Sequence, residues 1–415
     1  MVAAITGTLL GPGPMIVAGF SLLITAVAHD TGWSRATFSM IMPVISWTAA
    51  PTAPLYGRLM DRFGVRRVMI PAIAALGLFI MGLGLLTHTT WQFFLAYFLL
   101  GTVASASSPV GFNRFLMQWF IKNRGLTISL CAAVGSGVGY ALAPQIVNKI
   151  INTYGWRGAY VGLSLLILCI SVPVTLIFMR DRGQPDPETV LSARDHAAQL
   201  SAREGLTFRE GVKTRTLWLL VAIMFLQGNA YYGVLVHFVP IVTDCGLSRG
   251  IAATAISFVA LGAIGGQLTA SLVLDRVSSA RVALPFVVCG VIGLLLIQSA
   301  HTPFAFDVAA ILIGVGQGSE NSVIGYMTSR LLGLKSFGVF FGLMFGAITF
   351  ATGTGPLLMG YIFDRTGSYR PVMLAFDVML LIAIAAVLCL PPYAYGHKIT
   401  PGLSYDKPTR DPETV

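Results

Sequence analysis

Apolar stretches recur along almost the whole chain and are separated by short polar segments. Each stretch reaches roughly the 20 residues that a helix needs to cross a hydrocarbon layer of ~30 Å. We count twelve such windows, and pattern alone places their boundaries to within about four residues. The windows are 3–28, 36–56, 67–87, 92–119, 125–147, 158–179, 216–243, 251–273, 281–300, 305–329, 337–363 and 371–391.

The composition supports a membrane protein. Hydrophobic residues make up 55% of the chain and charged residues 11%, with a mean hydropathy of +0.77, whereas soluble domains carry roughly a quarter charged residues. The first window starts at Met1 without a basic flank or a cleavage site, so we interpret it as a retained span and not as a signal peptide. Its sequence GPGP (Gly11–Pro14) predicts a kink in this span. The alternative is that the helix is broken there and that the break contacts the substrate.

Basic residues are distributed unevenly between the two sides of the predicted membrane. With the N-terminus inside, 20 of the 27 Lys and Arg residues fall in inward loops, 6 fall in outward loops and Arg114 lies within a span. This positive-inside bias fits an even number of spans with both termini in the cytoplasm. This bias toward inward loops explains the net charge of +10, so the charge does not indicate a nucleic acid partner. The five cysteines have no CxxC or metal-ligand spacing, so we expect no metal and no cofactor.

The two halves of the chain repeat each other. The sequence GRLMDRFGVRR (57–67) aligns with SLVLDRVSSAR (271–281) at an offset of 214 residues. Because six spans separate the copies, the repeats are parallel and related by an axis along the membrane normal. We therefore predict an all-α fold of twelve transmembrane helices in two pseudosymmetric six-helix bundles. The predicted units are a first bundle (1–179), a cytoplasmic loop (180–215), a second bundle (216–393) and a cytoplasmic tail (394–415).

The loop after the second window carries the pattern G-x-L-x-D-R-x-G-x-R-R, which runs from Gly57 to Arg67. In a twelve-span context, this motif and its degraded second copy resemble the major facilitator superfamily of transporters. Within that superfamily the chain is most similar to bacterial members of the monocarboxylate porter family. The stretches that carry this likeness are Asp30–Ser39, Gln118–Gly139, Gly316–Gly338 and Gly355–Pro371.

The resemblance implies a major facilitator fold in the inner (cytoplasmic) membrane of a bacterium, and transport by alternating access. It also implies that the motif and its copy latch the inward mouth. Gly57 would let helix ends pack closely, and Asp61 could bind a helix N-terminus or an arginine. The alternative is that the arginines serve only topology. The expected gating residues are Gly57, Asp61, Arg62, Arg67, Asp275 and Arg276.

Ionisable side chains are expensive within a bilayer and usually face a water-filled cavity. Arg114 could hold a carboxylate bidentately, or it could extend to the interface. His237 is either a proton carrier at the cavity or a structural histidine with satisfied hydrogen bonds. Glu320 could load a proton, because burial favours the neutral form of a carboxyl group, or it could clamp a neighbouring helix permanently.

Polar neighbours in the same spans extend this set. The predicted substrate-binding residues are Asn113, Arg114, Asn229, Tyr231, His237, Gln267, Gln317, Glu320 and Asn321, with Glu320 and His237 as proton-coupling residues. Gln267 occupies the position at which the porters carry their substrate arginine, and the first span lacks the lysine of some relatives. Gln267 provides hydrogen bonds but no charge. Either Arg114 or His237 therefore supplies the counter-charge, or the substrate is neutral or weakly acidic.

Two functions remain open at this point. The first is a secondary carrier for a small, monocarboxylate-like organic acid that binds between the bundles and is coupled to proton symport. The second is an exporter or uncoupled facilitator of a neutral or aromatic molecule. We predict that the protein is not an enzyme, because the chain has no HExxH, phosphate loop or Ser/His/Asp arrangement. We expect a monomer whose partners are its small-molecule substrate, a proton and the lipid bilayer.

Overall fold

The structure is a computed structural model, and its description covers most of the chain. The described residues are 1–87, 89–107, 111–112, 115–116, 131–179, 205–274, 276, 279–333 and 335–395. These residues form helices, and the only β-type pairing among them is an isolated bridge between Gly205 and Gly333. The part of the predicted central loop before residue 205 and most of the predicted tail lie outside the described residues.

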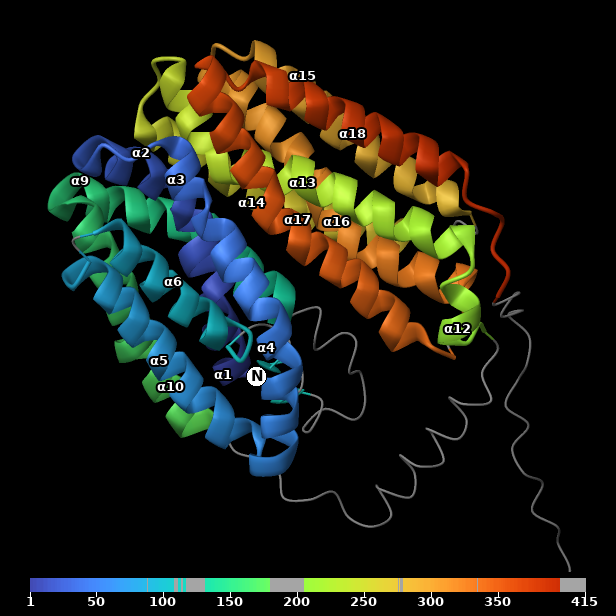
Figure 1. Cartoon of the computed structure of the whole chain (residues 1–415), viewed down its shortest axis with the longest axis horizontal. Coiled ribbons are helices and arrows are strands. Elements are labelled where there is room, and N and C mark those ends of the chain that lie inside the picture. Colours follow the sequence, from blue (N-terminus) through green and yellow to red (C-terminus); the bar gives the residue numbers. More distant parts are fainter. Residues whose placement is uncertain are drawn as a thin grey trace, which may run out of the picture.

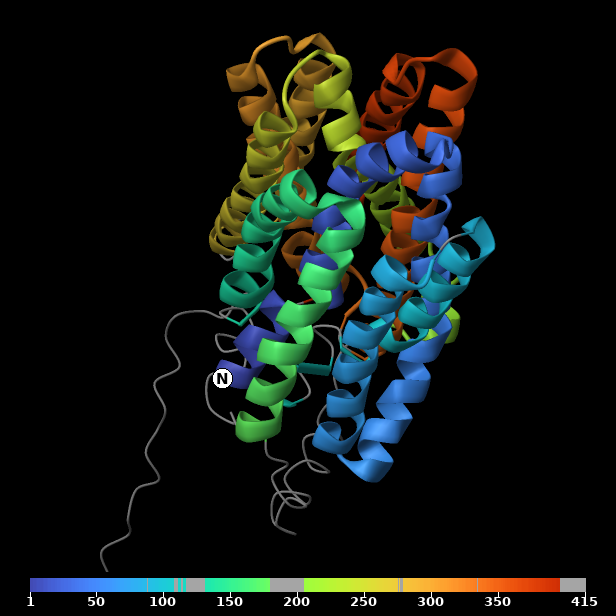
Figure 2. The ribbon, with the colours of Figure 1, turned by 90° about the vertical axis from the view of Figure 1, so that its left-hand side faces the viewer.

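The N-terminal half consists of helices that run back and forth along one common direction (Figures 1 and 2). Its described elements are α1 (Val2–Leu9), η1 (Gly13–Ala18), α2 (Gly19–Thr31), α3 (Arg35–Ser39), α4 (Ile41–Phe63), α5 (Val65–Leu85), α6 (Thr90–Ala104), η2 (Ala132–Gly137), α9 (Val138–Leu166), η3 (Ile167–Ser171) and α10 (Val172–Phe178).

The C-terminal half forms a second bundle beside the first, drawn from yellow-green to red in Figure 1. Its described elements are α12 (Phe208–Gly211), α13 (Arg215–Asp244), α14 (Arg249–Leu274), η4 (Ala280–Ala283), α15 (Leu284–Ser299), α16 (Pro303–Leu331), α17 (Phe337–Thr366) and α18 (Arg370–Leu388).

Each predicted window corresponds to a helix, as far as the described residues extend. Eight helices within them are long and apolar enough to cross a membrane. The stretch Val134–Phe178 counts once among these eight although it covers two predicted spans, because its helical elements follow one another without a gap. Gly155 (φ 69°, ψ −178°) breaks α9 within this stretch, so α9 consists of two helices. The predicted interruption of the first span is also present, since the π-helix η1 follows Gly11 and Pro12. Helices of this kind satisfy their own backbone hydrogen bonds, as the bilayer interior requires.

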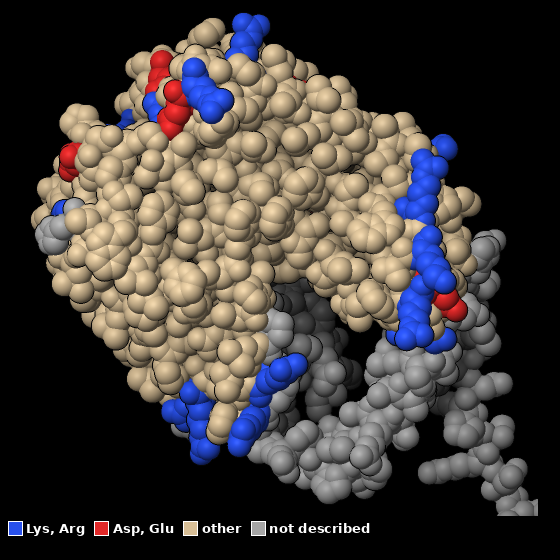
Figure 3. Space-filling model, viewed as in Figure 1, with Lys and Arg blue, Asp and Glu red and all other residues tan. Residues whose placement is uncertain are grey.

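The two halves contact each other chiefly through α2 with α13, α3 and α4 with α17, and α9 with α14. The end of the molecule that holds α3 is here named the closed end, because the two halves lie side by side there and diverge toward the opposite end (Figure 1). The opposite end, at the turn between α4 and α5, is named the open end. There the surface is hollowed between the halves, and Lys and Arg gather on both sides of the hollow (Figure 3).

Glycines allow the closest helix pair, α14 with α16, to pack backbone against backbone. A Cβ added at Gly262 would collide with the backbone at Ile311, and one added at Gly318 would collide with the backbone at Ala263. Small residues at such positions are typical of helix contacts within membranes, where lipid is as apolar as any side chain. This seam fixes α16 firmly and thereby sets the positions of Gln317 and Glu320.

Candidate functional site

A polar layer lies where the two halves meet near the middle of the helices. From the C-terminal half, the Tyr232 hydroxyl on α13 lies close to the Gln317 side chain on α16. From the N-terminal half, Tyr140 on α9 is close enough to Tyr232 to interact with it electrostatically. Each of these three groups, the two phenols and the amide, can donate as well as accept hydrogen bonds. Groups from both halves could therefore contact one small polar molecule.

The interruption of the first span belongs to the same layer. A Cβ added at Gly13 would lie 2.6 Å from the Tyr140 hydroxyl, so only glycine leaves room for this phenol. The sequence predicted Gln317 as a substrate-binding residue but did not predict Tyr232 or Tyr140. The signal for Tyr140 was the glycine in the GPGP segment, because a small residue at a helix break permits close approach.

Glu320 follows Gln317 by three residues on α16. Its side chain is inside the C-terminal half, in a small pocket formed by α13, α15, α16 and α18. The residue is 3% exposed, and its Oε1 has no hydrogen-bond partner among the described residues. Tyr231 also points into this half, where its hydroxyl is buried and has no described partner. The Tyr232 hydroxyl, which is close to Gln317, also interacts electrostatically with Glu320, so this pocket borders the polar layer.

Asn229 and Gln267 occupy further positions. The Asn229 Oδ1 accepts a hydrogen bond of 2.7 Å from Thr354, and its Nδ2 donates to the Phe225 carbonyl at 2.8 Å. Asn229 is 1% exposed, so it ties α13 to α17 in this state. Gln267 is half-buried on α14, one turn before Ser271, which contacts Ser322 of α16. No contact between described residues joins Gln267 to Glu320 or to the tyrosine layer.

His237 lies at the closed end and not in the central layer. Its Nε2 is 2.9 Å from the Ser39 hydroxyl and 3.1 Å from the Pro356 carbonyl, and its Nδ1 is 2.9 Å from the Tyr369 hydroxyl. The residue is fully buried. Ser39 belongs to the N-terminal half and the other partners to the C-terminal half, so the imidazole joins the two. In this state, both ring nitrogens of His237 have hydrogen-bond partners, as expected for a structural histidine.

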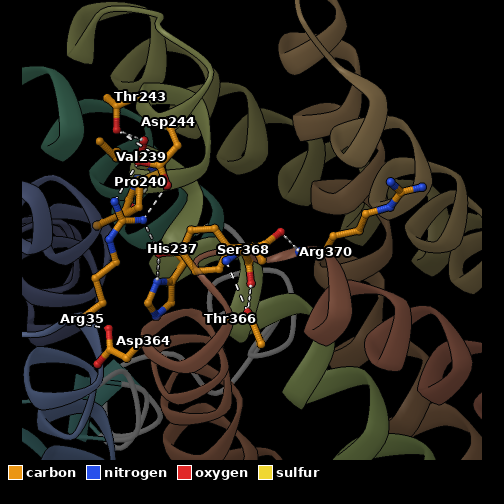
Figure 4. A network of polar contacts seen from close by, with 12 residues as sticks. Arg35, His237, Val239, Pro240, Thr243, Asp244, Asp364, Thr366, Ser368 and Arg370 are labelled. Carbon is orange, nitrogen blue, oxygen red and sulfur yellow. Dashed lines mark hydrogen bonds and ion pairs between the residues drawn. The ribbon is translucent and has the colours of Figure 1, made fainter.

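A charged network next to His237 closes this end (Figure 4). Arg35 of α3 forms a bidentate ion pair with Asp244 of α13, with Nη1–Oδ2 2.6 Å and Nη2–Oδ1 2.8 Å. The guanidinium also donates to the Tyr369 hydroxyl at 2.8 Å, and its central carbon lies 3.9 Å from the centre of the Phe363 ring. Burial alone would lower the pKa of Arg35, but the hydrogen bond to Asp244 and the neighbouring Tyr369 raise it.

Asp364 completes the network from α17. Its carboxylate accepts hydrogen bonds from the backbone N–H groups of Arg35 (3.2 Å) and Ala36 (2.9 Å). These groups form the first turn of α3, whose positive end favours an anion. A carboxylate of one half therefore caps a helix of the other. The sequence assigned none of these residues a role, although Arg35 and Asp364 lie in stretches that carry the likeness to the porters.

The predicted gating residues lie at the open end. Gly57 and Arg62 belong to the last turns of α4, and Arg67 to the first turn of α5, after Gly64 (φ 90°) has ended α4. Arg276 follows α14 in the other half. Three of the predicted residues, Asn113, Arg114 and Asp275, lie outside the described residues, and the side chains of Asp61 and Asn321 do as well. The latch at this end therefore stays a prediction.

Comparisons with known proteins agree with this architecture. The family model described as Major Facilitator Superfamily matches residues 13–345. The chain is 27% identical to the uncharacterized transporter YycB of Bacillus subtilis, over 90% of this chain and 87% of that protein. It is 25% identical to human monocarboxylate transporter 11, over 88% of this chain and 75% of that protein.

A solved structure shares the fold. It is the bacterial homologue of the human lysosomal transporter Spinster, in an inward-facing and unoccupied conformation. It matches 93% of this chain and 95% of its own chain with a TM-score of 0.71 and 15% sequence identity.

Proposed function

The chain belongs to the Major Facilitator Superfamily and is a multi-pass membrane transporter rather than an enzyme, and we propose that it carries a small organic acid together with a proton. In this proposal, the cargo binds between the halves, and the closed and open ends exchange roles during each cycle. The protein lies in the cytoplasmic membrane with both termini in the cytoplasm and acts as a monomer.

The observation that carries this proposal is the contrast between the two ends. The Arg35 network and His237 join the halves at the closed end, while the surface is hollowed between the halves at the open end (Figures 3 and 4). In this proposal the cargo enters from the open end, and the contacts at the closed end block its exit on the other side. The basic residues beside the hollow favour a cytoplasmic position for the open end. The described basic residues near the helix ends on this side include Arg58, Arg62, Arg66, Arg67, Arg209, Lys213, Arg215, Arg330 and Lys335.

An organic acid as cargo is supported by the likeness to a monocarboxylate transporter and by the chemistry of the central layer. The hydroxyls of Tyr140 and Tyr232 and the amide of Gln317 can donate hydrogen bonds to a carboxylate. Arg114 is our candidate for the counter-charge, since arginine binds carboxylates in a bidentate manner. Glu320 is our candidate for the proton, because His237 is already occupied by partners from both halves.

A second candidate function has its own support. Tyr140, Tyr232 and Gln317 carry no charge at neutral pH, and Gln267 replaces the arginine expected from the family. In addition, Trp47 of α4 and Phe350 of α17 stack across the boundary between the halves, with ring centroids 5.0 Å apart and planes inclined by 11°. Aromatic pairs of this kind also favour planar apolar ligands. Export or facilitated diffusion of a neutral, aromatic molecule is the alternative.

A comparison of matched ligands separates the two functions. L-lactate and its neutral amide, lactamide, have nearly the same shape, so a difference between them reports the carboxylate. We expect L-lactate to raise the unfolding temperature of the purified protein and lactamide to leave it unchanged. Equal stabilisation by both compounds would favour the neutral cargo. If aromatic neutral compounds stabilise the protein and no monocarboxylate does, the organic acid proposal is wrong.

A further inference from the structure

Basic side chains gather around the short connection between α12 and α13, at the open end of the C-terminal half (Figures 1 and 3). Arg209 belongs to α12, Lys213 lies between the two helices, and Arg215 is the first residue of α13. All three are exposed, and their side chains form no hydrogen bond or ion pair with another described residue. Exposed cations of this kind attract anions. The segment 209–215 is here named the basic turn.

Packing and hydrogen bonding hold the backbone of the basic turn in place. The Val212 carbonyl accepts a hydrogen bond of 2.9 Å from the indole N–H of Trp218 on α13. Gly211 packs against α17, where an added Cβ would collide with the ring of Phe340. The cations are therefore carried by a connection that is fixed to two long helices.

The basic turn contains a single acidic residue, Glu210, and this carboxylate already has partners. It accepts a hydrogen bond of 2.8 Å from the backbone N–H of Thr207. It also interacts electrostatically with Lys335, an exposed residue just before α17. Lys335 thus balances the charge of Glu210, and the three cations of the basic turn leave the surface positive.

Apolar side chains are exposed beside these cations. Phe208 is 43% exposed, Trp218 is 56% exposed, and Val339, the neighbour of Phe340, is 51% exposed. Trp218 lies three residues after the start of α13, a distance of about 4.5 Å along a helix, and α13 is long enough to cross a membrane. A tryptophan at such a position is typical of the boundary between lipid headgroups and acyl chains.

We propose that the basic turn, together with Lys335 and Trp218, binds the headgroup of an anionic phospholipid. The cations contact the phosphate oxygens through charge-assisted hydrogen bonds, and the exposed rings of Phe208 and Trp218 lie against the upper acyl chains. A phospholipid offers both a charged part and an apolar part to this surface, whereas a free phosphate offers only the charged part. This binding does not depend on which cargo the transporter carries.

Quenching of Trp218 fluorescence by brominated lipids tests the proposal. The chain has six tryptophans, so the contribution of Trp218 is the difference between the wild-type protein and Trp218→Phe. Vesicles of phosphatidylcholine receive the same small fraction of either brominated phosphatidylglycerol or brominated phosphatidylcholine. We expect brominated phosphatidylglycerol to quench Trp218 more strongly. Equal quenching by the two brominated lipids would overturn the proposal.

Substitutions and salt identify the groups that cause the preference. Arg209→Gln and Lys213→Gln should each lower the preference for phosphatidylglycerol by up to about fivefold, whereas Arg365→Gln, at the closed end, should retain it. High salt should lower the preference in the wild-type protein as well, because salt screens exposed charges, and this measurement needs no variant. A preference that persists in the double variant Arg209→Gln/Lys213→Gln and in high salt would contradict binding by these cations.

Trp91 provides a matched control at the start of α6, at the closed end. It is 64% exposed, and the neighbouring Arg157 already donates hydrogen bonds to the carbonyls of Gly84 (3.3 Å) and Thr87 (2.9 Å). The fluorescence lost in Trp91→Phe should be quenched equally by the two brominated lipids. The same preference at Trp91 would indicate a general attraction of the basic protein to anionic membranes and would contradict a local site.

Inorganic phosphate distinguishes a lipid from a soluble anion. At equal ionic strength, sodium phosphate and sodium chloride should lower the preference for phosphatidylglycerol at Trp218 to the same extent. A larger loss in sodium phosphate would indicate that the basic turn binds a free phosphate group, and it would overturn the assignment to a phospholipid.

Discussion

Replacement of Arg35 by glutamine is expected to open the closed end. The side chain makes its described polar contacts with the opposite half of the protein: the ion pair to Asp244 and the hydrogen bond to Tyr369. Its stacking partner Phe363 also belongs to that half. All these contacts must break when the halves separate at this end. Removing them therefore destabilises the present state without destabilising the alternative state.

The size of the effect follows from burial and geometry. The side chains of Arg35 and Asp244 are 20% and 38% exposed, so solvent screens the pair in part and its contribution is about 1 kcal/mol. The hydrogen bond to Tyr369 adds about 1 kcal/mol, and the stacking on Phe363 adds about 1 kcal/mol. A total of about 3 kcal/mol changes the ratio of the two states roughly 100-fold. A protein with this end open about 1% of the time would then have it open about half of the time.

Distances between spin labels can measure this change. Tyr154 and Phe304 lie at the closed end of the two halves and are 74% and 77% exposed, so both accept a label. In a background whose five cysteines are replaced by serine, Tyr154→Cys and Phe304→Cys should give one dominant short distance. With Arg35→Gln, a second and longer distance should appear with comparable weight.

The control is another arginine at the same end. Arg365 lies 4.5 Å from the ring of Tyr361 on its own helix and makes no described contact with the N-terminal half. Arg365→Gln should leave the distance distribution unchanged. If Arg35→Gln also leaves it unchanged, the ion pair does not hold this end closed and the reasoning from its geometry is refuted.

Three further substitutions address the remaining sites. Tyr232→Phe should raise the KM for cargo roughly tenfold by removing one hydrogen bond and leave kcat nearly unchanged; an unaltered KM would exclude this hydroxyl from the site. Gln267→Arg should increase affinity for L-lactate about tenfold through a charged hydrogen bond, as measured by competition with labelled cargo, and no gain would argue against a family-like pocket. Asp61→Asn should shift the balance toward opening at the α4–α5 turn without altering ligand preference, as measured by cysteine accessibility there; an altered preference would contradict a purely gating role.

The helices of this protein could be predicted from sequence with few errors. In a membrane, each backbone polar group must be satisfied within its own helix, so an apolar stretch of sufficient length specifies a span. The GPGP segment likewise specified an interruption of the first span, and η1 follows it directly. Within the described residues, the boundary between the two spans at Gly155 is hard to see in the helix pattern, because a single residue with positive φ interrupts an otherwise continuous helix.

The contacts between the halves could not be predicted in the same way. Arg35 and Asp244 are 209 residues apart, and nothing in the local pattern of either indicates the other. The same limit applies to His237, whose partners Ser39 and Tyr369 come from opposite ends of the chain. Hydropathy also cannot tell which of the adjacent Tyr231 and Tyr232 faces the interior of its half, because both lie on an apolar helix. Only the packing of α13 against its neighbours decides this.

Uptake of labelled L-lactate into liposomes that contain the purified wild-type protein tests the central claim most directly. The lumen is held at neutral pH while the outside is either acidic or neutral. We predict accumulation above the external concentration under the inward proton gradient, and only equilibration without it. Uptake that reaches the same level under both conditions would contradict a proton-coupled carrier of organic acids.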